Sequence, residues 1–457
     1  MGLSSDAVAI ARAAVRSVGP SVGVRRVLAV RSGRVRIGGT DWAPAADGSV
    51  RVVALGKAGG PLLDEASRVL GDARGDAIAA VGEGYPRPKV RAKVLVGEHP
   101  VPGSGSLKAG QALREFVNRT SGGDSLLFLL SGGGSAIAEV PADGITLADL
   151  RETTRALLAS GAPIGATNTI RRHLSRLKGG GLARAAGTRR LATLAISDVV
   201  GDVPWEIASG PTVPDPTTFR DAVAAVRRYH LRDRLPRRVR RYLQDGVAGR
   251  LPETWKPAED GPAIERFHLV GSNRLAQEAA ARAAARRGYA VDVRRTHVIG
   301  EAAEAGRALA RELRAKALRN RRPFALISGG ETTVRLGRTH GVGGRNEEMA
   351  LAAAAALDGV PGVVFLTVAT DGVDGPTDSA GGQVDGTTAG RARRRQVDLA
   401  AALRRHDADG ALRALGARYV TGPTGTNVAD LQIRLGGSRT GSTHRPGAAS
   451  ASRRRRS

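Results

Sequence analysis

The sequence contains no cysteine, so neither disulfides nor thiolate chemistry can contribute to its fold or its activity. Aromatic residues make up only 3% of the chain, which disfavours the base-stacking surfaces of proteins that bind single-stranded nucleic acid. No apolar run approaches the roughly 20 residues that a membrane-spanning helix needs. Residues 1–19 also lack the unbroken apolar core of a signal peptide. We therefore expect a cytoplasmic protein without membrane segments.

Lysine is scarce although the formal net charge is +27. It stands only at positions 57, 89, 93, 108, 178, 256 and 316, and the other basic residues are arginines spread along the whole chain. An even excess of arginine indicates either a generally basic solvated surface or a real affinity for polyanions, as strongly charged proteins can have. Composition alone leaves both interpretations open.

Several common nucleotide and metal motifs are missing as well. The chain has no Gly-x-x-x-x-Gly-Lys-Ser/Thr phosphate loop, no Gly-x-Gly-x-x-Gly after a predicted strand and no His-Glu-x-x-His. These absences argue against ordinary P-loop kinases, nicotinamide dehydrogenases of the usual type and zincins.

What the chain does contain is a repeated alternation of short apolar runs with longer segments of helical period. Because strands that alternate with helices form α/β layers, we expect an α/β fold with mostly parallel, buried strands. In such sheets ligands bind beyond the carboxyl ends of the strands. The runs that we predict as strands are 51–55, 93–97, 125–130, 191–196, 267–271, 324–328 and 362–370.

The length of 457 residues predicts more than one domain. Three prolines and several glycines between residues 245 and 263 are typical of a linker. We predict an N-terminal domain over residues 1–250, a linker over 251–263 and a smaller C-terminal domain over 264–435. The segment 436–457 is rich in Ser, Gly and Arg without periodicity and indicates a disordered tail, whose four final arginines could contact polyanions.

Glycine-rich loops follow two of the predicted strands in the first half. In "LGKAGG" (55–60), Lys57 adds a positive charge just before a helix start, a place already suited to anions. In "LSGGGSA" (130–136), Gly132, Gly133 and Gly134 allow successive backbone N–H groups to converge on a phosphate oxygen. A surface lysine and a plain tight turn are the alternatives.

Carboxylates gather in two further loops. Asp198 and Asp202 lie four residues apart across a glycine, and Asp371 directly follows the predicted strand 362–370, with Asp374 and Asp378 close behind. Carboxylates brought together in a loop suit Mg²⁺, which takes one or two of them and leaves its other positions to water and phosphate. Helix capping and turn formation compete with this reading. An EF-hand is excluded because its twelfth position in 371–382 is Gly382.

A fifth glycine-rich loop, "GVGGRNEEMAL" (341–351), places Arg345 and Asn346 at a predicted helix start. A cation is disfavoured there by the helix dipole, which makes more sense if an anion binds at the same place. Glu347 and Glu348 could simply offset the charge. Taken together, the loops predict phosphoryl transfer without a P-loop, in which Lys57 and Arg345 offset phosphate charge and aspartates hold Mg²⁺ or orient a hydroxyl.

Seven segments of the chain occur in a specific order: "SGGGSA", "NTIRRHLSRLKGGGLA", "SDVVGDVPWEIASGPTVPDPTT", "ISGGETTV", "GGRNEEMAL", "ATDGVDGPTDSAGGQVD" and "TGPTGTNVADLQI". Through them the chain, between about residues 5 and 435, resembles the glycerate 2-kinase family, which carries the domain called MOFRL. The resemblance implies a Rossmann-like N-terminal domain, a smaller α/β domain and an active site in the cleft between them. It also implies ATP-dependent phosphorylation of D-glycerate to 2-phosphoglycerate with Mg²⁺ or another divalent cation.

The same resemblance implies roles for single residues. Lys57 and Arg345 match the family's catalytic lysine and arginine, and we add Asp371 as a third catalytic residue. The residues expected to bind substrate or ATP are Gly132, Gly133, Gly134, Ser135, Asn346 and Asn427; those expected to bind metal are Asp198, Asp202 and Asp371. The chain departs from relatives at Glu347, where they usually have Gln, and at Ala429, where they often have Asn.

Two other functions stay open at this point. Hydroxypyruvate reductase is a label attached to similar sequences, but it requires nicotinamide binding, and the dinucleotide fingerprint is missing. A polyanion-binding protein is favoured by the charge and the tail, and we expect nucleic acid to bind only non-specifically through that tail. The expected partners are therefore glycerate and ATP, with no membrane, and the sequence leaves a homodimer open.

Overall fold

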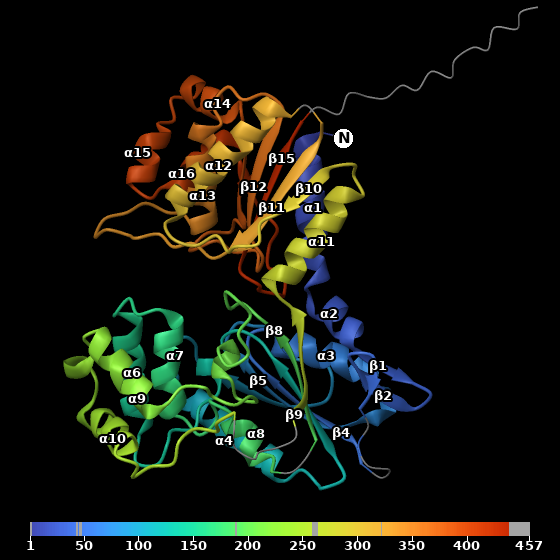
Figure 1. Cartoon of the computed structure of the whole chain (residues 1–457), viewed down its shortest axis with the longest axis vertical. Coiled ribbons are helices and arrows are strands. Elements are labelled where there is room, and N and C mark those ends of the chain that lie inside the picture. The colour runs from blue at the N-terminus through green and yellow to red at the C-terminus, as the bar shows by residue number, and fades with distance from the viewer. Residues whose placement is uncertain are drawn as a thin grey trace, which may run out of the picture.

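Two six-stranded sheets organise the chain in the computed structural model, which describes residues 2–42, 44, 48–187, 190–257, 264–320 and 322–437. The sheets lie in two lobes: the first lobe, built on β4 to β9, is the lower one in Figure 1, and the second lobe, built on β10 to β15, is the upper one. Within the described ranges, no helix is long and apolar enough to cross a membrane. Residues 258–263 of the predicted linker and residues 438–457 of the predicted tail lie outside them.

The sheet of the first lobe has the strand order β6-β5-β4-β7-β8-β9, and every pairing in it is parallel. The chain places β5 and β6 on one side of β4 and then returns to place β7 on the other side. Such a reversal opens a crevice at the carboxyl ends of the two central strands, where open α/β sheets bind ligands. The strands are β4 (Val50–Leu55), β5 (Arg74–Gly82), β6 (Lys93–Gly97), β7 (Ser125–Leu130), β8 (Leu191–Ile196) and β9 (Ile264–Gly271).

Helices cover both faces of this sheet, and a group of four stands beside it. The group of α6, α7, α9 and α10 has its own apolar core around Leu150, Ile170 and Phe219 (Figure 1). A small sheet of β1 (Leu28–Arg31), β2 (Arg34–Ile37) and β3 (Thr40–Asp41) adjoins α2 and α3. The helices are α2 (Pro20–Val27), α3 (Gly59–Leu70), α4 (Ser104–Asn118), α5 (Gly134–Ile137), α6 (Leu147–Leu158), α7 (Ile164–His173), α8 (Gly181–Ala185), α9 (Phe219–Arg228) and α10 (Arg237–Val247), with 3₁₀ turns Gly71–Ala73, Ile207–Ser209 and Arg232–Arg234.

The sheet of the second lobe has the order β10-β11-β15-β12-β13-β14, and of its pairings only that of β10 with β11 is parallel. The expectation of mostly parallel strands is therefore confirmed for the first sheet, whereas the second sheet is mostly antiparallel. The reason is that β15, the last strand, inserts between β11 and β12 and runs opposite to both. The strands are β10 (Ala290–Val293), β11 (Phe324–Gly330), β12 (Val363–Ala369), β13 (Gly381–Asp385), β14 (Arg418–Tyr419) and β15 (Asp430–Gly436).

Two helix layers sandwich the second sheet. Helices α1 and α11 cover one face, and α12 to α16 lie on the other, as Figure 1 shows. Alanine-rich faces allow α12 and α13 to approach closely; at Gly306 an added Cβ would lie 2.3 Å from the carbonyl oxygen of Met349. The helices are α1 (Leu3–Ser17), α11 (Asn273–Ala285), α12 (Ala302–Arg319), α13 (Arg345–Ala356), α14 (Thr388–Arg394), α15 (Leu399–Arg404) and α16 (Ala408–Leu415).

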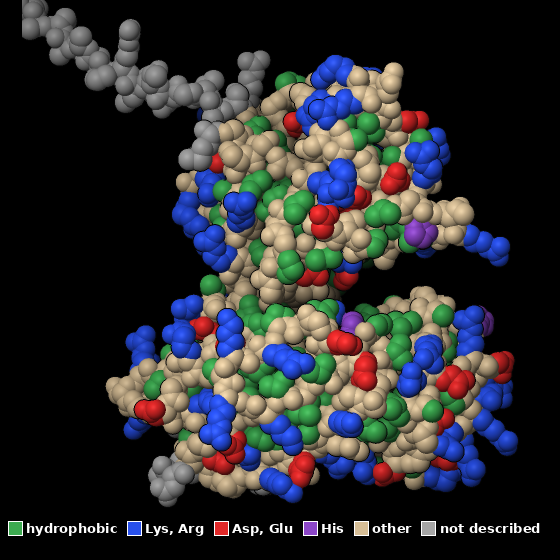
Figure 2. All heavy atoms as spheres, turned by 180° about the vertical axis from the view of Figure 1, so that it is seen from behind, with side chains coloured by type: hydrophobic (Ala, Val, Ile, Leu, Met, Phe, Trp, Pro, Cys, Tyr) green, Lys and Arg blue, Asp and Glu red, His purple; other side chains and the backbone are tan. Residues whose placement is uncertain are grey.

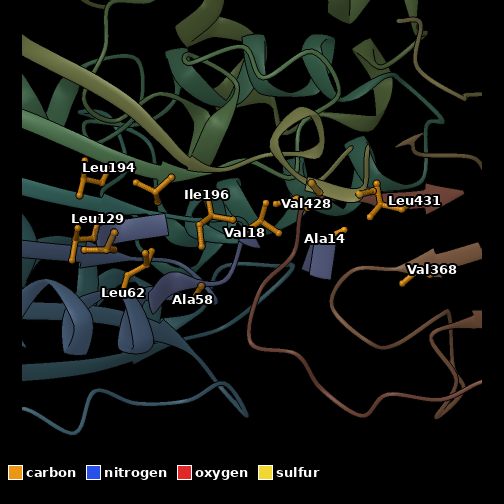
Figure 3. Packing of buried hydrophobic residues seen from close by; sticks show 14 of the residues in the cluster. Ala14, Val18, Ala58, Leu62, Leu129, Leu194, Ile196, Val368, Val428 and Leu431 are labelled. Atoms are coloured by element: carbon orange, nitrogen blue, oxygen red, sulfur yellow. The ribbon is translucent and has the colours of Figure 1, made fainter. Parts of the chain in front are cut away.

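The lobes are joined by a continuous apolar cluster on one side of the molecule. Figure 3 shows Val18 and Ala14 between Ile196 of the first sheet and Leu431 of the second, and all four belong to one buried cluster. The hydroxyl of Thr426 in the second lobe also donates to the carbonyl oxygen of Val18 at 3.0 Å. This seam fixes one side of the lobes against each other and leaves the opposite side free to form a cleft.

The sheets do not divide the chain where the predicted domains do. Strand β9 begins at residue 264, where we predicted the second domain to start, yet it pairs with β8 at the edge of the first sheet. Helix α1, within the predicted first domain, packs against α11 and the second sheet. Judged by packing, we propose that the second domain begins at Ser272 and borrows residues 3–17 from the N-terminus.

Candidate active site

The loops that follow β4 and β7 meet at the reversal point of the first sheet. The backbone N–H of Lys57 donates to the carbonyl oxygen of Gly132 at 2.9 Å, and the N–H of Ala58 donates to the hydroxyl of Ser131 at 3.0 Å. Ser131 is 2% exposed, so its hydroxyl serves the loop itself. These bonds hold the lysine loop against the triple-glycine loop at the edge of the sheet where ligands are expected.

Glycine is required at two positions of this junction. Gly56 has a φ of +119°, and a Cβ there would lie 2.4 Å from the carbonyl oxygen of Ser131. A Cβ on Gly132 would lie 1.9 Å from Oδ2 of Asp198, which follows β8. The missing side chains therefore allow three strand ends to approach one another, and they bring the Asp198 carboxylate directly against the glycine loop.

Asp198 lies within the electrostatic reach of both lobes. Burial raises the pKa of its carboxyl group, the charge of Lys57 lowers it and the charge of Asp371 raises it, and the net shift is upward. Lys57 comes from the first lobe and Asp371 from the second. The side chains of Lys57 and Asp371, which we predicted from separate loops, therefore lie close enough to Asp198 for their charges to shift its pKa.

The second lobe presents Arg345 in a fixed position at the start of α13. Its Nε and Nη2 donate to the two carboxylate oxygens of Asp430 at 2.6 and 3.0 Å, and its Nη1 lies 2.8 Å from Oε1 of Glu331. Burial lowers the pKa of Arg345. The hydrogen bond and charge of Asp430, followed by the charge of Glu331, raise this pKa by more than burial lowers it, so the guanidinium stays charged. A bidentate pair with a carboxylate that is 1% exposed fixes the guanidinium plane.

Asp371 follows β12 and joins the same group. Burial raises the pKa of its carboxyl group, as does the charge of Asp430, whereas a hydrogen bond from the N–H of Val373 and the charges of Arg345 and Lys57 lower it; the net shift is upward. Glu331 shows the same pattern, with burial first and the charges of Arg345, Asp430, Asp198 and Asp371 after it. We call Lys57, Asp198, Glu331, Arg345, Asp371 and Asp430 the cleft cluster.

A cavity of about 440 Å³ lies between the lobes and is lined from both sides. Figure 2 shows the hollow that separates the lobes opposite their junction. A wider hollow of about 820 Å³ runs along α1, but it is lined by neither glycine-rich loop and by no carboxylate. The cleft is therefore the better candidate site. Its lining includes Gly132, Gly133, Ser135 and Asp198 from the first lobe and Glu331, Asn427 and Ala429 from the second.

The predicted site residues fall into two groups. Gly132, Gly133, Ser135 and Asn427 line the cavity, and the side chains of Lys57, Arg345 and Asp371 interact with cluster members beside it. The others are placed differently: Gly134 is buried at the start of α5, and an added Cβ would lie 2.8 Å from Cβ of Ala208. Asp202 neither lines the cavity nor shows an interaction with Asp198 or Asp371.

Asn346 has no exposed surface and holds the helix rather than facing the cavity. Its backbone N–H and its side-chain amide both donate to Oδ1 of Asp374, at 3.1 and 3.2 Å. The hydroxyl of Thr367 donates to its carbonyl oxygen at 2.8 Å. These contacts make Asn346 fix the start of α13, and thereby Arg345, whereas the substrate or ATP contact that the sequence predicted for it stays a prediction.

Four residues of the cleft were not predicted. Glu331 directly follows β11, whose last residues are Ser-Gly-Gly and echo the Ser-Gly-Gly after β7; this repeat was the available signal. Asp430 lies within "TNVADL" and is the first residue of a strand, so no sequence pattern identifies it as a residue of the site. His99 and Arg171 also line the cavity. Burial and then the positive charges of Lys57 and Arg171 lower the pKa of His99 to about 4, so the imidazole is neutral at pH 7.

The cleft offers a divalent cation only a few possible ligands. Among the residues that the structure describes, no three His, Asp or Glu side chains converge as a complete metal site. Asp198 and Asp371, however, are two partly buried carboxylates close enough for the charge of Asp371 to raise the pKa of Asp198. A pair of carboxylates suits Mg²⁺ when phosphate oxygens and water complete the shell. The residues therefore fit a metal that arrives with a nucleotide better than a resident one.

Comparison with known proteins covers nearly the whole chain. Two family models match: a domain of unknown function, DUF4147, at residues 6–244, and the MOFRL family at residues 324–430. A glycerate 2-kinase of Pyrococcus horikoshii is 38% identical over 94% of this chain and 96% of its own length. A protein of Agrobacterium vitis, provisionally named a hydroxypyruvate reductase, is 42% identical over 84% of this chain and 86% of its own. The crystal structure of a glycerate kinase from Thermotoga maritima matches with a TM-score of 0.82 at 35% identity, over 95% of this chain and 99% of that one.

Proposed function

The chain belongs to the glycerate 2-kinase family, and we propose that it transfers the γ-phosphoryl group of ATP to the 2-hydroxyl of D-glycerate. The observation that carries this proposal is the cleft cluster itself. Lysine and aspartate from the first lobe meet arginine, glutamate and two aspartates from the second around one cavity. Phosphoryl transfer needs such a site, because its catalysis consists mainly of positioning and of offsetting charge on the transferred group.

Each charged residue then has a role in the reaction. The bond between O2 of glycerate and Pγ forms while the bond between Pγ and the β,γ-bridging oxygen breaks, so negative charge develops on the ADP side. Lys57 and Arg345 offset that charge from opposite lobes. Asp371 accepts the hydrogen bond of the attacking hydroxyl and takes its proton, and its raised pKa suits a group that must bind a proton during the reaction.

The loops that follow β4 and β7, at the reversal point of the first sheet, support nucleotide binding. The turn through Gly132 and Gly133 lines the cavity and presents backbone close to a bound phosphate, as only glycine allows. Asp198 and Asp371 would hold Mg²⁺, which, when bound with ATP, neutralises charge on the β- and γ-phosphates. We also propose that Asn427, on the second lobe's side of the cavity, contacts substrate or nucleotide.

The direct test is an assay with ATP and D-glycerate in which the phosphoglycerate isomer is identified enzymatically. We expect 2-phosphoglycerate; formation of 3-phosphoglycerate would refute the assigned acceptor oxygen. Oxidation of NADH or NADPH with hydroxypyruvate, in the absence of kinase activity, would instead support the reductase alternative.

Variants test the assigned cations. Lys57→Ala should lower kcat by about 10³-fold or more, since a charge placed on the transferred group contributes about 10³–10⁵ in related chemistry. Its matched control is Lys108→Ala, an exposed lysine on α4. At Arg345 we prefer lysine to alanine, because Arg345→Lys keeps a charge beside Asp430 while losing the bidentate geometry. Near-normal turnover in both site variants would contradict these roles.

A further inference from the structure

Arg171 lies on α7 and lines the cavity from the first lobe, but the cleft cluster does not include it. Its Nη2 donates to the carbonyl oxygen of Ser135 at 2.8 Å, and this bond holds the guanidinium against the loop that follows β7. Within the part of the chain that the structure describes, no carboxylate forms an ion pair with it. Arg345 differs from Arg171 in this respect, because two carboxylates hold the guanidinium of Arg345.

Two carboxylates around Arg171, Glu206 in the same cavity lining and Glu139 behind it in electrostatic reach, are already engaged by other residues. Glu206 accepts from Nη1 of Arg172 at 3.1 Å and from the amide of Asn168 at 2.7 Å. Glu139 forms a buried ion pair with Lys178, and its charge reaches Arg171 only as a secondary influence. A guanidinium stays protonated in proteins, so Arg171 is a charged donor in a poorly solvated wall with donors to spare.

The surroundings of Arg171 favour a small planar anion. His99 and Arg171 line the same cavity, and the charges of Lys57 and Arg171 both act on His99, whose lowered pKa keeps it neutral. The cavity lining also contains the apolar residues Leu158 and Ile164, which are themselves exposed, whereas Arg171 is desolvated by burial, which lowers its pKa. Poorly solvated surroundings strengthen an ionic contact, and the guanidinium fork matches a carboxylate through two parallel N–H donors.

We propose that Arg171 binds the carboxylate of the acceptor substrate and thereby selects 2-hydroxy acids over uncharged alcohols. The inference rests on the proposed function, and it adds the residue that recognises the acid. It divides the cations of the site between two ligands. Lys57 and Arg345 serve the phosphoryl group, whereas Arg171 anchors the end of glycerate that does not react and so sets which hydroxyl faces the phosphate.

The test compares Arg171→Gln and Arg171→Lys with the wild-type chain and with Arg151→Gln, an exposed arginine on α6. A lost charge-assisted contact weakens binding by roughly tenfold to a hundredfold. We expect KM for D-glycerate to rise by that factor in Arg171→Gln and less in Arg171→Lys, while KM for ATP stays within about twofold in each. Arg171→Gln should also narrow the preference for glycerate over its neutral amide, glyceramide.

Three outcomes would overturn the inference: an unchanged KM for glycerate in Arg171→Gln, an equal change in Arg151→Gln, or a rise in KM for ATP alone. Absence of glycerate phosphorylation in the wild type would instead contradict the proposed function. Binding of D-glycerate, measured by calorimetry on wild type and variant, then still decides the role of Arg171.

A second measurement needs no variant and covers the case in which Arg171→Gln does not fold. Wild-type protein is treated with phenylglyoxal, and peptide mass spectrometry follows the modification of each arginine. We expect D-glycerate to protect Arg171 and a non-hydrolysable ATP analogue to leave it reactive. Protection by the analogue and not by glycerate would refute the assignment.

Discussion

Removal of the Asp374 carboxylate should loosen the helix that carries Arg345. Asp374 is 2% exposed and lies in the loop after β12. Its Oδ1 accepts from the N–H of Asn346 at 3.1 Å and its Oδ2 from the N–H of Glu347 at 2.7 Å. These N–H groups belong to the first turn of α13 and have no partner within the helix. Asp374 therefore caps α13 from a distant segment, with its charge at the positive end of the helix dipole.

The magnitude follows from those contacts. Asp374→Ala removes the acceptor of two buried backbone N–H groups and of the side-chain amide of Asn346, and each donor left unpaired costs about 1–3 kcal/mol. Burial raises the pKa of Asp374 to about 6, so part of the gain from these bonds is already offset by the cost of the buried charge at pH 7. We expect a net loss of about 2–4 kcal/mol in the free energy of unfolding of the second lobe, given that offset. At about 2–4 °C per kcal/mol for a unit of this size, the melting temperature should fall by about 4–16 °C.

Calorimetric unfolding of wild type, Asp374→Ala, Asp374→Asn and the control Asp378→Ala measures this loss. Asp374→Asn keeps one acceptor oxygen and should lie between the extremes, whereas Asp378 belongs to the same loop but its side chain is 73% exposed. Since α13 begins at Arg345, kcat should fall as well. A melting temperature of Asp374→Ala within about 1 °C of wild type would show that the cap contributes little and that Arg345 is positioned by other contacts.

Three further predictions concern the surroundings of the site. Gly132→Ala should lower kcat more than tenfold with little change in melting temperature, because its Cβ would meet Oδ2 of Asp198 at 1.9 Å and displace that carboxylate; a melting temperature that falls with kcat would contradict this. Asp430→Asn should cost about 3–5 kcal/mol of stability, measured by urea unfolding, since it breaks a buried pair with Arg345. Burial and then the charge of Asp374 raise the pKa of Glu347 from 4.5 to about 8. The contribution of Glu347 to the free energy of unfolding is therefore greatest below about pH 4.5, and it is lost as the pH rises through 8. Glu347→Gln should therefore raise the melting temperature at pH 9 but hardly at pH 5, and equal effects at both values would refute the shift.

The sequence predicted the first lobe better than the second for a physical reason. Strands β7 and β8 are buried on both faces, so they read as unbroken apolar runs that can be recognised without knowing their neighbours. Strand β5 was missed because it begins "RGDA" and its alanines suit a helix equally well. The insertion of β15 between β11 and β12, and the crossing of α1 into the second lobe, depend on contacts distant in sequence that no local pattern encodes.

The site shows the same division between local and distant information. Lys57, Asp198 and Asp371 were recognisable because each follows a strand in a glycine-rich turn, where functional groups gather in α/β folds. The role predicted for Asn346 in binding a ligand stays a prediction, because its place beside Arg345 in sequence does not say which of the two side chains contacts a ligand. Asp430 and Arg171 were missed because one begins a strand and the other lies on a helix, so only the packing of the elements reveals them.

The roles that we propose for Lys57 and Arg345 imply that neither lobe suffices for catalysis. Arg345 is held by Asp430 and Glu331, so the second lobe by itself offers a triphosphate a cation with two carboxylates beside it. Lys57 forms no ion pair among the described residues, but it stands on the other lobe. A triphosphate gains favourable contacts with both cations only when it bridges the cleft, and the apolar seam at Val18 keeps the two half-sites in register for that purpose. Catalysis should therefore depend on the apolar seam as well as on the charged residues, because loosening the seam would separate Lys57 from Arg345 without altering either side chain.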